Sequence, residues 1–246
     1  MKTSDRLVTL VLLLAAPAAR WLELKTQLDA DGLPTGGIPY LVPPLAAAAS
    51  IFLYSARRLP ARDTVTADFG GIFRFDGQLT LTAAVMGAFL LFASAALRFV
   101  YHGSGRLNLL LALFLALSGA ALLYVLVALR RRCAFLPAAL LVPVCFLVVQ
   151  LIITYRANAR ESVLLHFYVE LLLLAALCLA ALYLSAFAYR CGSPRRFAFM
   201  ARMALTLAGG CCTDLFLAGR YDDLAACLGA LVLLIAFLEA AGDFEG

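Results

Sequence analysis

Stretches of about twenty apolar residues recur along this 246-residue chain, and they constrain its fold more than any other feature. At ~1.5 Å of rise per residue, a helix of that length crosses a hydrocarbon core ~30 Å thick. A soluble helical protein would need a polar stripe on each helix, but Leu107–Leu129 and Ala134–Ile153 are apolar on nearly every face. Only 14% of the residues are charged, against about a quarter in soluble domains. The sequence therefore predicts an all-α, polytopic bundle of transmembrane helices.

The apolar runs predict about eight spans in a single transmembrane domain that covers residues 1–246. Two spans are less apolar, because the first carries three charges between Arg20 and Lys25, and the seventh carries Arg202 and Asp214. The first run also resembles a secretory signal peptide, which would remove residues 1–18, although its apolar pattern continues beyond them. Short connections predict that consecutive helices pack as antiparallel neighbours. The expected spans are 6–25, 38–57, 78–101, 106–129, 134–155, 162–189, 197–218 and 224–241.

The basic residues predict how the chain is oriented. With the N-terminus in the cytoplasm, thirteen of the twenty Lys and Arg residues fall on the inner side and seven on the outer side. Both termini are then cytoplasmic, and the expected location is the inner (plasma) membrane. The chain has 18 Arg and only two Lys, which is typical of a GC-rich bacterial genome. Basic residues at helix ends do not indicate nucleic-acid binding.

Smaller patterns predict local features of the bundle. Ala83 with Gly87, and Ala225 with Gly229, have the small-residue spacing that lets two helices approach closely. In residues 63–77 aromatic side chains alternate with small or polar ones, which predicts a short hairpin or an interfacial segment. The seven cysteines show no metal-binding spacing and indicate packing rather than a disulfide framework. No cofactor is expected.

Ionisable residues gather toward the outer ends of the predicted spans. Such residues are costly in hydrocarbon, so each one requires a reason. His166 and Glu170 lie four residues apart on one helix face, and counting from position 162 places Glu170 about 12 Å inward. A carboxylate there should be neutral, or paired with Arg98 or Arg20. The candidate ligand-binding residues are His166, Glu170, Arg98, His102, Arg156 and Arg160.

Several functions are compatible with this outer set. An outward-facing polar cavity would bind or transport a solute, whereas the same residues could simply form structural ion pairs between helices. A second hypothesis is a membrane-embedded enzyme acting on a lipid-linked substrate, with His166 and Glu170 as acid and base. A third is a sensor or assembly subunit. The chain contains no common catalytic or nucleotide-binding motif, so transport would be ion-coupled, facilitated, or driven by a separate energising subunit. The lipid bilayer is the one partner that composition itself implies.

Overall fold

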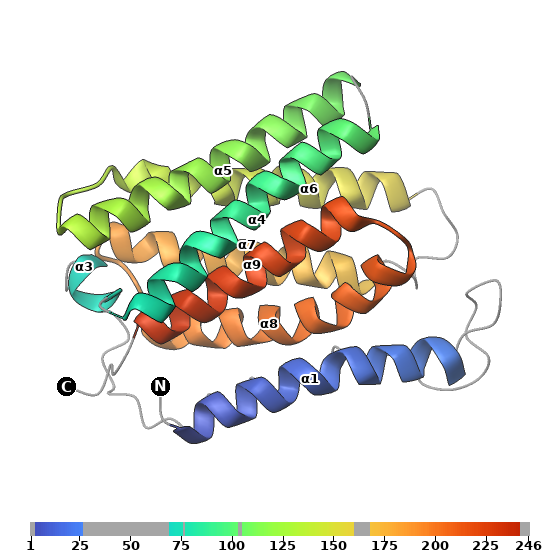
Figure 1. Ribbon diagram of the computed structural model, residues 1–246, viewed down its shortest axis with the longest axis horizontal. Coiled ribbons are helices and arrows are strands. Elements are labelled where there is room, and N and C mark those ends of the chain that lie inside the picture. Colours follow the sequence, from blue (N-terminus) through green and yellow to red (C-terminus); the bar gives the residue numbers. More distant parts are fainter. Residues whose placement is uncertain (1–2, 27–68, 76, 103–104, 160–167, 242–246) are drawn as a thin grey trace.

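The computed structural model describes residues 3–26, 69–75, 77–102, 105–159 and 168–241, and every regular element among them is helical (Figure 1). These residues form eight α-helices and one short 3-10 helix. They are α1 (Thr3–Thr26), α3 (Phe69–Ile72), α4 (Gln78–His102), α5 (Arg106–Arg131), η1 (Pro137–Leu140), α6 (Leu141–Asn158), α7 (Tyr168–Ala188), α8 (Pro194–Leu217) and α9 (Tyr221–Ala240).

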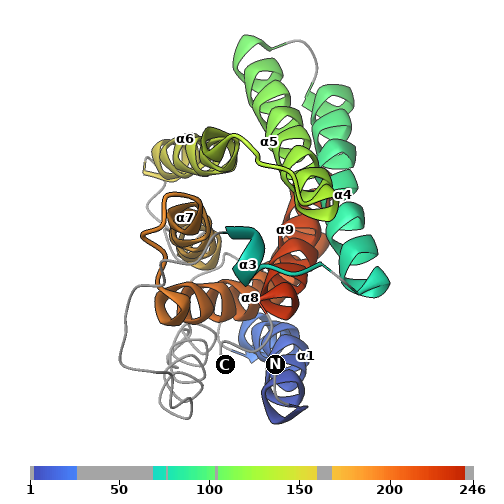
Figure 2. The same cartoon turned by 90° about the vertical axis from the view of Figure 1, so that its left-hand side faces the viewer.

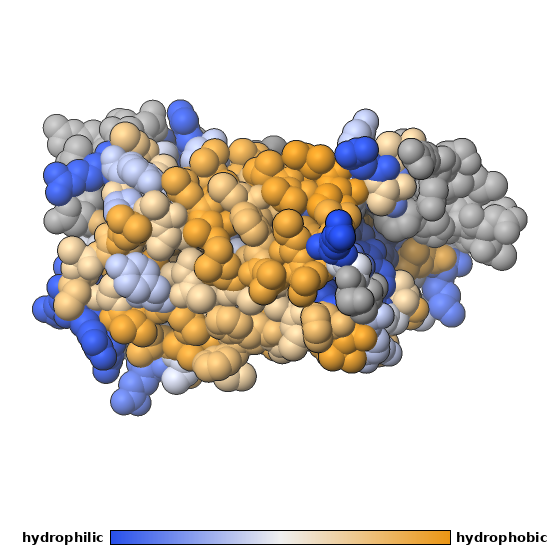
Figure 3. All heavy atoms as spheres, turned by 90° about the horizontal axis from the view of Figure 1, so that it is seen from above, coloured by the Kyte–Doolittle hydropathy of each residue, from blue (hydrophilic) through white to orange (hydrophobic). Residues whose placement is uncertain are grey.

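Six helices in the described part of the chain are long and apolar enough to cross a membrane. They are Gln78–Tyr101, Arg106–Arg131, Pro137–Asn158, Tyr168–Ala188, Pro194–Leu217 and Tyr221–Ala240. Figure 3 shows apolar residues across the middle of the face over α5, with hydrophilic residues toward both ends. An apolar band between polar ends is the surface that a bilayer requires. The chain is a multi-span membrane protein.

Six of the eight expected spans are confirmed by these helices, whose ends differ from the expected ones by a few residues. The second expected span, 38–57, lies outside the described residues. The first one forms α1 as expected, although α1 is not among the six helices given above. The span expected from 134 begins later, because Leu136 is extended and Pro137 opens the 3-10 turn that leads into α6.

The six apolar helices form a closed ring (Figure 2). Each of them packs on the next one in the sequence, as the short connections predict, and α9 closes the ring by packing on α4. We call the end where α4, α6 and α8 finish the charged end, and the opposite end the α3 end. Outside the ring, α1 lies along α8, and its last turns are at the charged end (Figure 1).

The ring closes through two facing glycines, Gly87 on α4 and Gly229 on α9. A Cβ added to Gly87 would lie 2.8 Å from Leu233 Cγ and 2.9 Å from the carbonyl oxygen of Gly229. No side chain larger than hydrogen fits there without moving backbone. The close contact predicted from the small-residue spacing is therefore confirmed, and it joins the first helix of the ring to the last.

The α3 segment occupies the opposite end of the ring. Phe73 is 1% exposed, and its ring packs edge-on against Phe187, Phe197 and Phe237 from α7, α8 and α9. The amide of Arg74 donates to the carbonyl oxygen of Ala240 at 3.0 Å. The expectation of a hairpin or an interfacial segment is wrong for residues 69–75, because these aromatic side chains bury more apolar surface inside the ring than at an interface.

Candidate functional site

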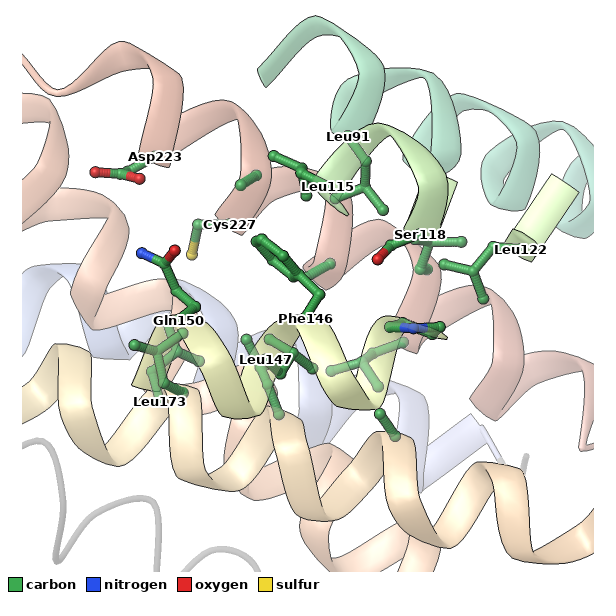
Figure 4. A pocket seen from close by; sticks show the side chains of 18 of the residues that line it. Leu91, Leu115, Ser118, Leu122, Phe146, Leu147, Gln150, Leu173, Asp223 and Cys227 are labelled. Carbon is green, nitrogen blue, oxygen red and sulfur yellow. The ribbon is translucent and has the colours of Figure 1, made fainter. Parts of the chain in front are cut away.

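A cavity of about 150 Å³ lies inside the helix ring. All six ring helices contribute to its wall, and most of the contributing side chains are apolar (Figure 4). We call this cavity the lumen. Its polar lining residues include Arg98, Gln150, Glu170 and Asp223, which come from α4, α6, α7 and α9. Figure 4 shows Gln150 and Asp223 near one end, with Ser118 and Leu122 toward the other.

Arg98 is the central cation at this end of the lumen. Its Nη1 donates to Gln150 Oε1 at 3.1 Å, and its Nη2 donates to Asp223 Oδ1. Its Nε lies 3.8 Å from Asp222 Oδ2, which is an ion pair but too long for a hydrogen bond. The Arg98 side chain is 8% exposed, and Nε has no hydrogen-bond acceptor among the described residues. Arg98 thus ties α4 to α6 and α9.

Arg220, in the connection between α8 and α9, extends this network. Its Nη1 and Nη2 donate to the two oxygens of Glu170 at 2.9 and 3.1 Å, and its Nε donates to Asp223 Oδ2 at 2.9 Å. Burial opposes the charge of Arg220, but its bonds to Glu170 and the charges of both carboxylates outweigh burial and raise its pKa above the ordinary value. A continuous chain of charged bonds therefore joins α7 to α9 and α4.

A second buried network lies at the same end, between α1 and the ring. Arg20 is 1% exposed; its Nε donates to both oxygens of Asp214 at 2.9 and 3.0 Å, and its Nη1 donates to Glu23 at 2.9 Å. The hydroxyl of Tyr168 accepts from Arg20 at 3.0 Å and donates to Glu23 at 2.7 Å. These bonds fasten the end of α1 to α7 and α8.

The expected pairing of Glu170 with Arg98 or Arg20 is wrong. Glu170 binds Arg220, while Arg98 and Arg20 each have carboxylates of their own. The expected depth is also wrong, because Glu170 binds Arg220, which lies in the connection between α8 and α9 at the end of the ring. The predicted polar cavity is instead an apolar lumen whose charged residues are bonded to one another at one end.

Of the other predicted site residues, none is shown to line the lumen. Arg156 is exposed near the end of α6. His102 is the last residue of α4, and its side chain lies outside the described part. Arg160 and His166 also lie outside the described residues. The structure thus brings Arg98 and Glu170 to one cavity, Arg156 lies away from it, and a ligand-binding role stays a prediction for all six residues.

Sequence reasoning missed three residues of the charged end: Arg220, Asp222 and Asp223. In the sequence, Arg220 counts only as an outer-side charge, and two acidic residues at the start of a helix are a common way to complement its dipole. One available signal was that three charged residues in four positions separate two apolar spans on the side where Arg98 and Glu170 are expected.

No protein-family model matches this chain, and neither a curated protein nor a solved structure matches it. Its own geometry shows a multi-span membrane protein with six membrane-length apolar helices in a ring around an apolar lumen. One end of that lumen is bounded by paired charges, which can fix the helices in place and can orient a polar group of a bound molecule.

Proposed function

We propose that this protein binds a small, largely apolar molecule with one hydrogen-bond acceptor in the lumen of its helix ring. The observation that carries the proposal is an apolar cavity, bounded by all six ring helices, with polar side chains near one end. Ligand sites in proteins commonly combine apolar walls with a few convergent polar groups. Structural ion pairs alone explain the bonds of Arg98, but they do not require the cavity beside them.

The size of the lumen limits the ligand. A cavity of about 150 Å³ lined mostly by aliphatic and aromatic side chains is large enough to hold a benzene ring. Leu115, Phe146 and Leu173 are among the apolar side chains around it (Figure 4). A strongly hydrated solute would lose its water there without regaining equivalent bonds. A ring or a short hydrocarbon chain fits better than a sugar or a free ion.

The charged end favours an acceptor on the ligand. Arg98 and Gln150 bond to each other, and because the Gln150 carbonyl oxygen faces Arg98, the Gln150 amide nitrogen is left as a donor. Both residues line the lumen. The carboxylates of Glu170 and Asp223 are already bonded to arginines. A hydroxyl or carbonyl oxygen is therefore the group that this end would bind.

The enzyme alternative has less support. Both oxygens of Glu170 accept hydrogen bonds from Arg220, so this carboxylate is committed to an ion pair rather than placed as a general acid or base. Its expected partner, His166, lies outside the described residues. The described lining of the lumen offers no other pair of groups with acid and base roles.

The location of the ring in a cell is part of the proposal. The α3 end carries Arg130–Arg132 at the end of α5 and Arg195–Arg196 at the start of α8. Arginines near the ends of spans favour the cytoplasmic side. We place the α3 end in the cytoplasm, with the chain as a single transmembrane domain of a bacterial plasma membrane. The charged end and the polar end of the lumen then face outward.

Photolabelling tests lumen binding. The protein in lipid nanodiscs would be irradiated with a medium-chain alkanol that carries a diazirine, and labelled residues would be located by mass spectrometry. The alkanol matches the site, because it combines an apolar chain with one hydroxyl. Labels are expected on lumen residues such as Phe146 and Cys227, and excess unlabelled alkanol should suppress them.

Two variants of α5 distinguish labelling inside the lumen from labelling at the lipid-facing surface. Ser118→Phe fills the lumen and should abolish labelling of Phe146, whereas Leu117→Phe, at a position 52% exposed, should leave it unchanged. The proposal fails if labels fall only on lipid-facing residues, or if both variants behave like the parent protein.

A further inference from the structure

A second cavity, of about 1010 Å³, lies at the α3 end. It is lined by the α3 segment, by the end of α5 with the chain that follows it, and by the end of α7. We call it the basic vestibule, because four arginines line it and no acidic residue is among its described lining: Arg74, Arg130, Arg132 and Arg190. It is separate from the lumen and independent of the function proposed above.

Aromatic side chains separate the two cavities. Phe73 and Phe75 line the vestibule, Phe237 lines the lumen, and the ring of Phe237 packs edge-on against both at centroid distances of 5.7 and 5.4 Å. The vestibule therefore has an apolar floor beneath its basic lining. A bound molecule would meet guanidinium groups and aromatic rings in one place.

Two of the four arginines occupy a backbone position that usually favours glycine. Arg132 (φ 53°) directly follows α5 and Arg190 (φ 59°) lies two residues after α7, both in the left-handed region. In each case the next amide bonds back across the turn, Cys133 to Ala128 and Cys191 to Ala186, both at 3.0 Å. This pair of matching helix ends holds the two arginine backbones at the edge of one cavity. Arginine occupies both positions despite the conformational cost.

The charge balance of the vestibule favours an anion. The guanidinium groups of Arg74, Arg130 and Arg132 make no ion pair within the described part of the chain. The ends of α5 and α7 contribute a helix-dipole charge of about −0.5 each, which is small against the guanidinium charges of Arg74, Arg130 and Arg132. These dipoles explain why some basic residues lie here, but Arg131 in the last turn of α5 already serves that purpose without lining the cavity.

We propose that the basic vestibule binds a phosphate group. Guanidinium groups bind phosphate oxygens in a bidentate geometry, and several of them together favour a multiply charged oxyanion over chloride. The phosphate could belong to the headgroup of an anionic lipid or to a soluble phosphorylated molecule, whose apolar part would lie against the aromatic floor. Both sources present the same chemistry to the arginines.

Cys133 provides a direct measurement, because it is an exposed free cysteine that lines the vestibule. The protein would be placed in nanodiscs of phosphatidylcholine, and the rate at which an uncharged maleimide modifies Cys133 would be followed by mass spectrometry. Pyrophosphate at about ten times its Kd should slow this reaction about tenfold relative to sodium chloride at equal ionic strength, because only the unoccupied fraction reacts. Calorimetric titration of pyrophosphate gives the Kd independently.

Variants show whether the vestibule itself is responsible. Arg130→Gln and Arg132→Gln should weaken protection by pyrophosphate, and Arg131→Gln, between them in the sequence, should not. A change that is equal in all three variants would indicate general surface charge and would overturn the proposal. The melting temperature of each variant shows that it is folded.

Nanodiscs that contain phosphatidylglycerol distinguish the two sources. If the lipid headgroup is the ligand, Cys133 is protected without pyrophosphate, and Arg130→Gln removes that protection. If the ligand is soluble, pyrophosphate protects Cys133 equally in both kinds of nanodisc. The proposal is overturned if neither pyrophosphate nor phosphatidylglycerol changes the modification rate of Cys133, or if calorimetry detects no pyrophosphate binding and the lipid has no effect.

Discussion

Arg98 of α4 and Asp223 of α9 form a partly buried ion pair across the joint that closes the helix ring. Eleven residues along α4 from this pair, Gly87 meets Gly229 of the same partner helix. The interface between α4 and α9 thus contains an ion pair at one position and a close backbone contact at another. Because α9 is the last helix and α4 the first of the six, this interface decides whether the lumen is enclosed.

Replacing Arg98 should strongly destabilise the protein. Arg98→Met removes the cation that Asp222 and Asp223 share. Because Asp223 keeps its bonds to Arg220, the cost should lie at the lower end of the range for a broken buried pair, about 3 kcal/mol of unfolding free energy. Arg220→Gln removes a guanidinium that is 38% exposed and should cost only about 1 kcal/mol. Unfolding in detergent, followed by circular dichroism, measures both.

A double variant distinguishes the energetic contribution of the ion pair from a simple loss of packing. Arg98→Met combined with Asp223→Leu removes both charges, so it should be more stable than the sum of the single losses predicts, by about 0.5–3 kcal/mol. Additive losses would show that Arg98 and Asp223 do not interact energetically, and the role assigned to the pair would then be wrong.

The glycine contact predicts a graded series of alanine variants. Gly87→Ala places Cβ 2.8 Å from Leu233 Cγ and against the Gly229 backbone, so it should lower the unfolding free energy by about 1–3 kcal/mol. Gly119→Ala, whose Cβ would lie 3.2 Å from the movable ring of Phe92 and 3.3 Å from the carbonyl oxygen of Ala88, should cost less. A Cβ on Gly71 meets nothing within 4 Å, and Gly71→Ala should change stability by less than about 0.5 kcal/mol.

The order of these three effects is the test. Melting temperatures of the variants in one detergent should fall in the order Gly71→Ala, Gly119→Ala, Gly87→Ala, from highest to lowest. If Gly87→Ala melts with the parent protein, α4 and α9 do not approach as closely as the structure shows.

The spans were predictable because length and hydropathy decide them almost alone. The apolar run from Leu107 to Leu129 can satisfy its backbone in hydrocarbon only as a helix, so its place in the sequence fixes its structure. The contact of Gly87 with Gly229 was only half predictable. Small residues at helical spacing show that each helix can be approached closely, but not which helix approaches it.

The charged end was less predictable, because ion pairs depend on which helices are neighbours. Glu170 and Arg98 were both recognised as costly in a membrane, yet each found a different partner. Those partners, Arg220 and Asp223, come together only when α9 returns to α4 and closes the ring. Single-sequence patterns carry no information on that closure. The burial of Phe73 at the α3 end was missed for the same reason, since its partners come from three later helices.

The left-handed helix ends predict a stabilising substitution. Arg132→Gly removes the steric cost of φ 53° but also a favourable charge at the end of α5, and we expect a net gain of about 0.5–1 kcal/mol. Arg131 has ordinary helical geometry, so Arg131→Gly should lose about 0.5–1 kcal/mol. Thermal unfolding of the two variants should therefore shift in opposite directions. Equal shifts would mean that Arg132 is not strained.

Labelling of cysteines on the two ends of the ring tests the proposed orientation. Cys133 is exposed at the α3 end, and Arg106→Cys would place a thiol at an exposed position of the charged end. If arginines at the α3 end keep it in the cytoplasm, a membrane-impermeant maleimide added to intact cells should modify the cysteine at position 106 and not Cys133. After permeabilisation both should react. The reverse pattern would place the charged end, and with it the polar end of the lumen, on the cytoplasmic side. A ligand from outside would then have to reach the lumen past Phe73 and Phe237.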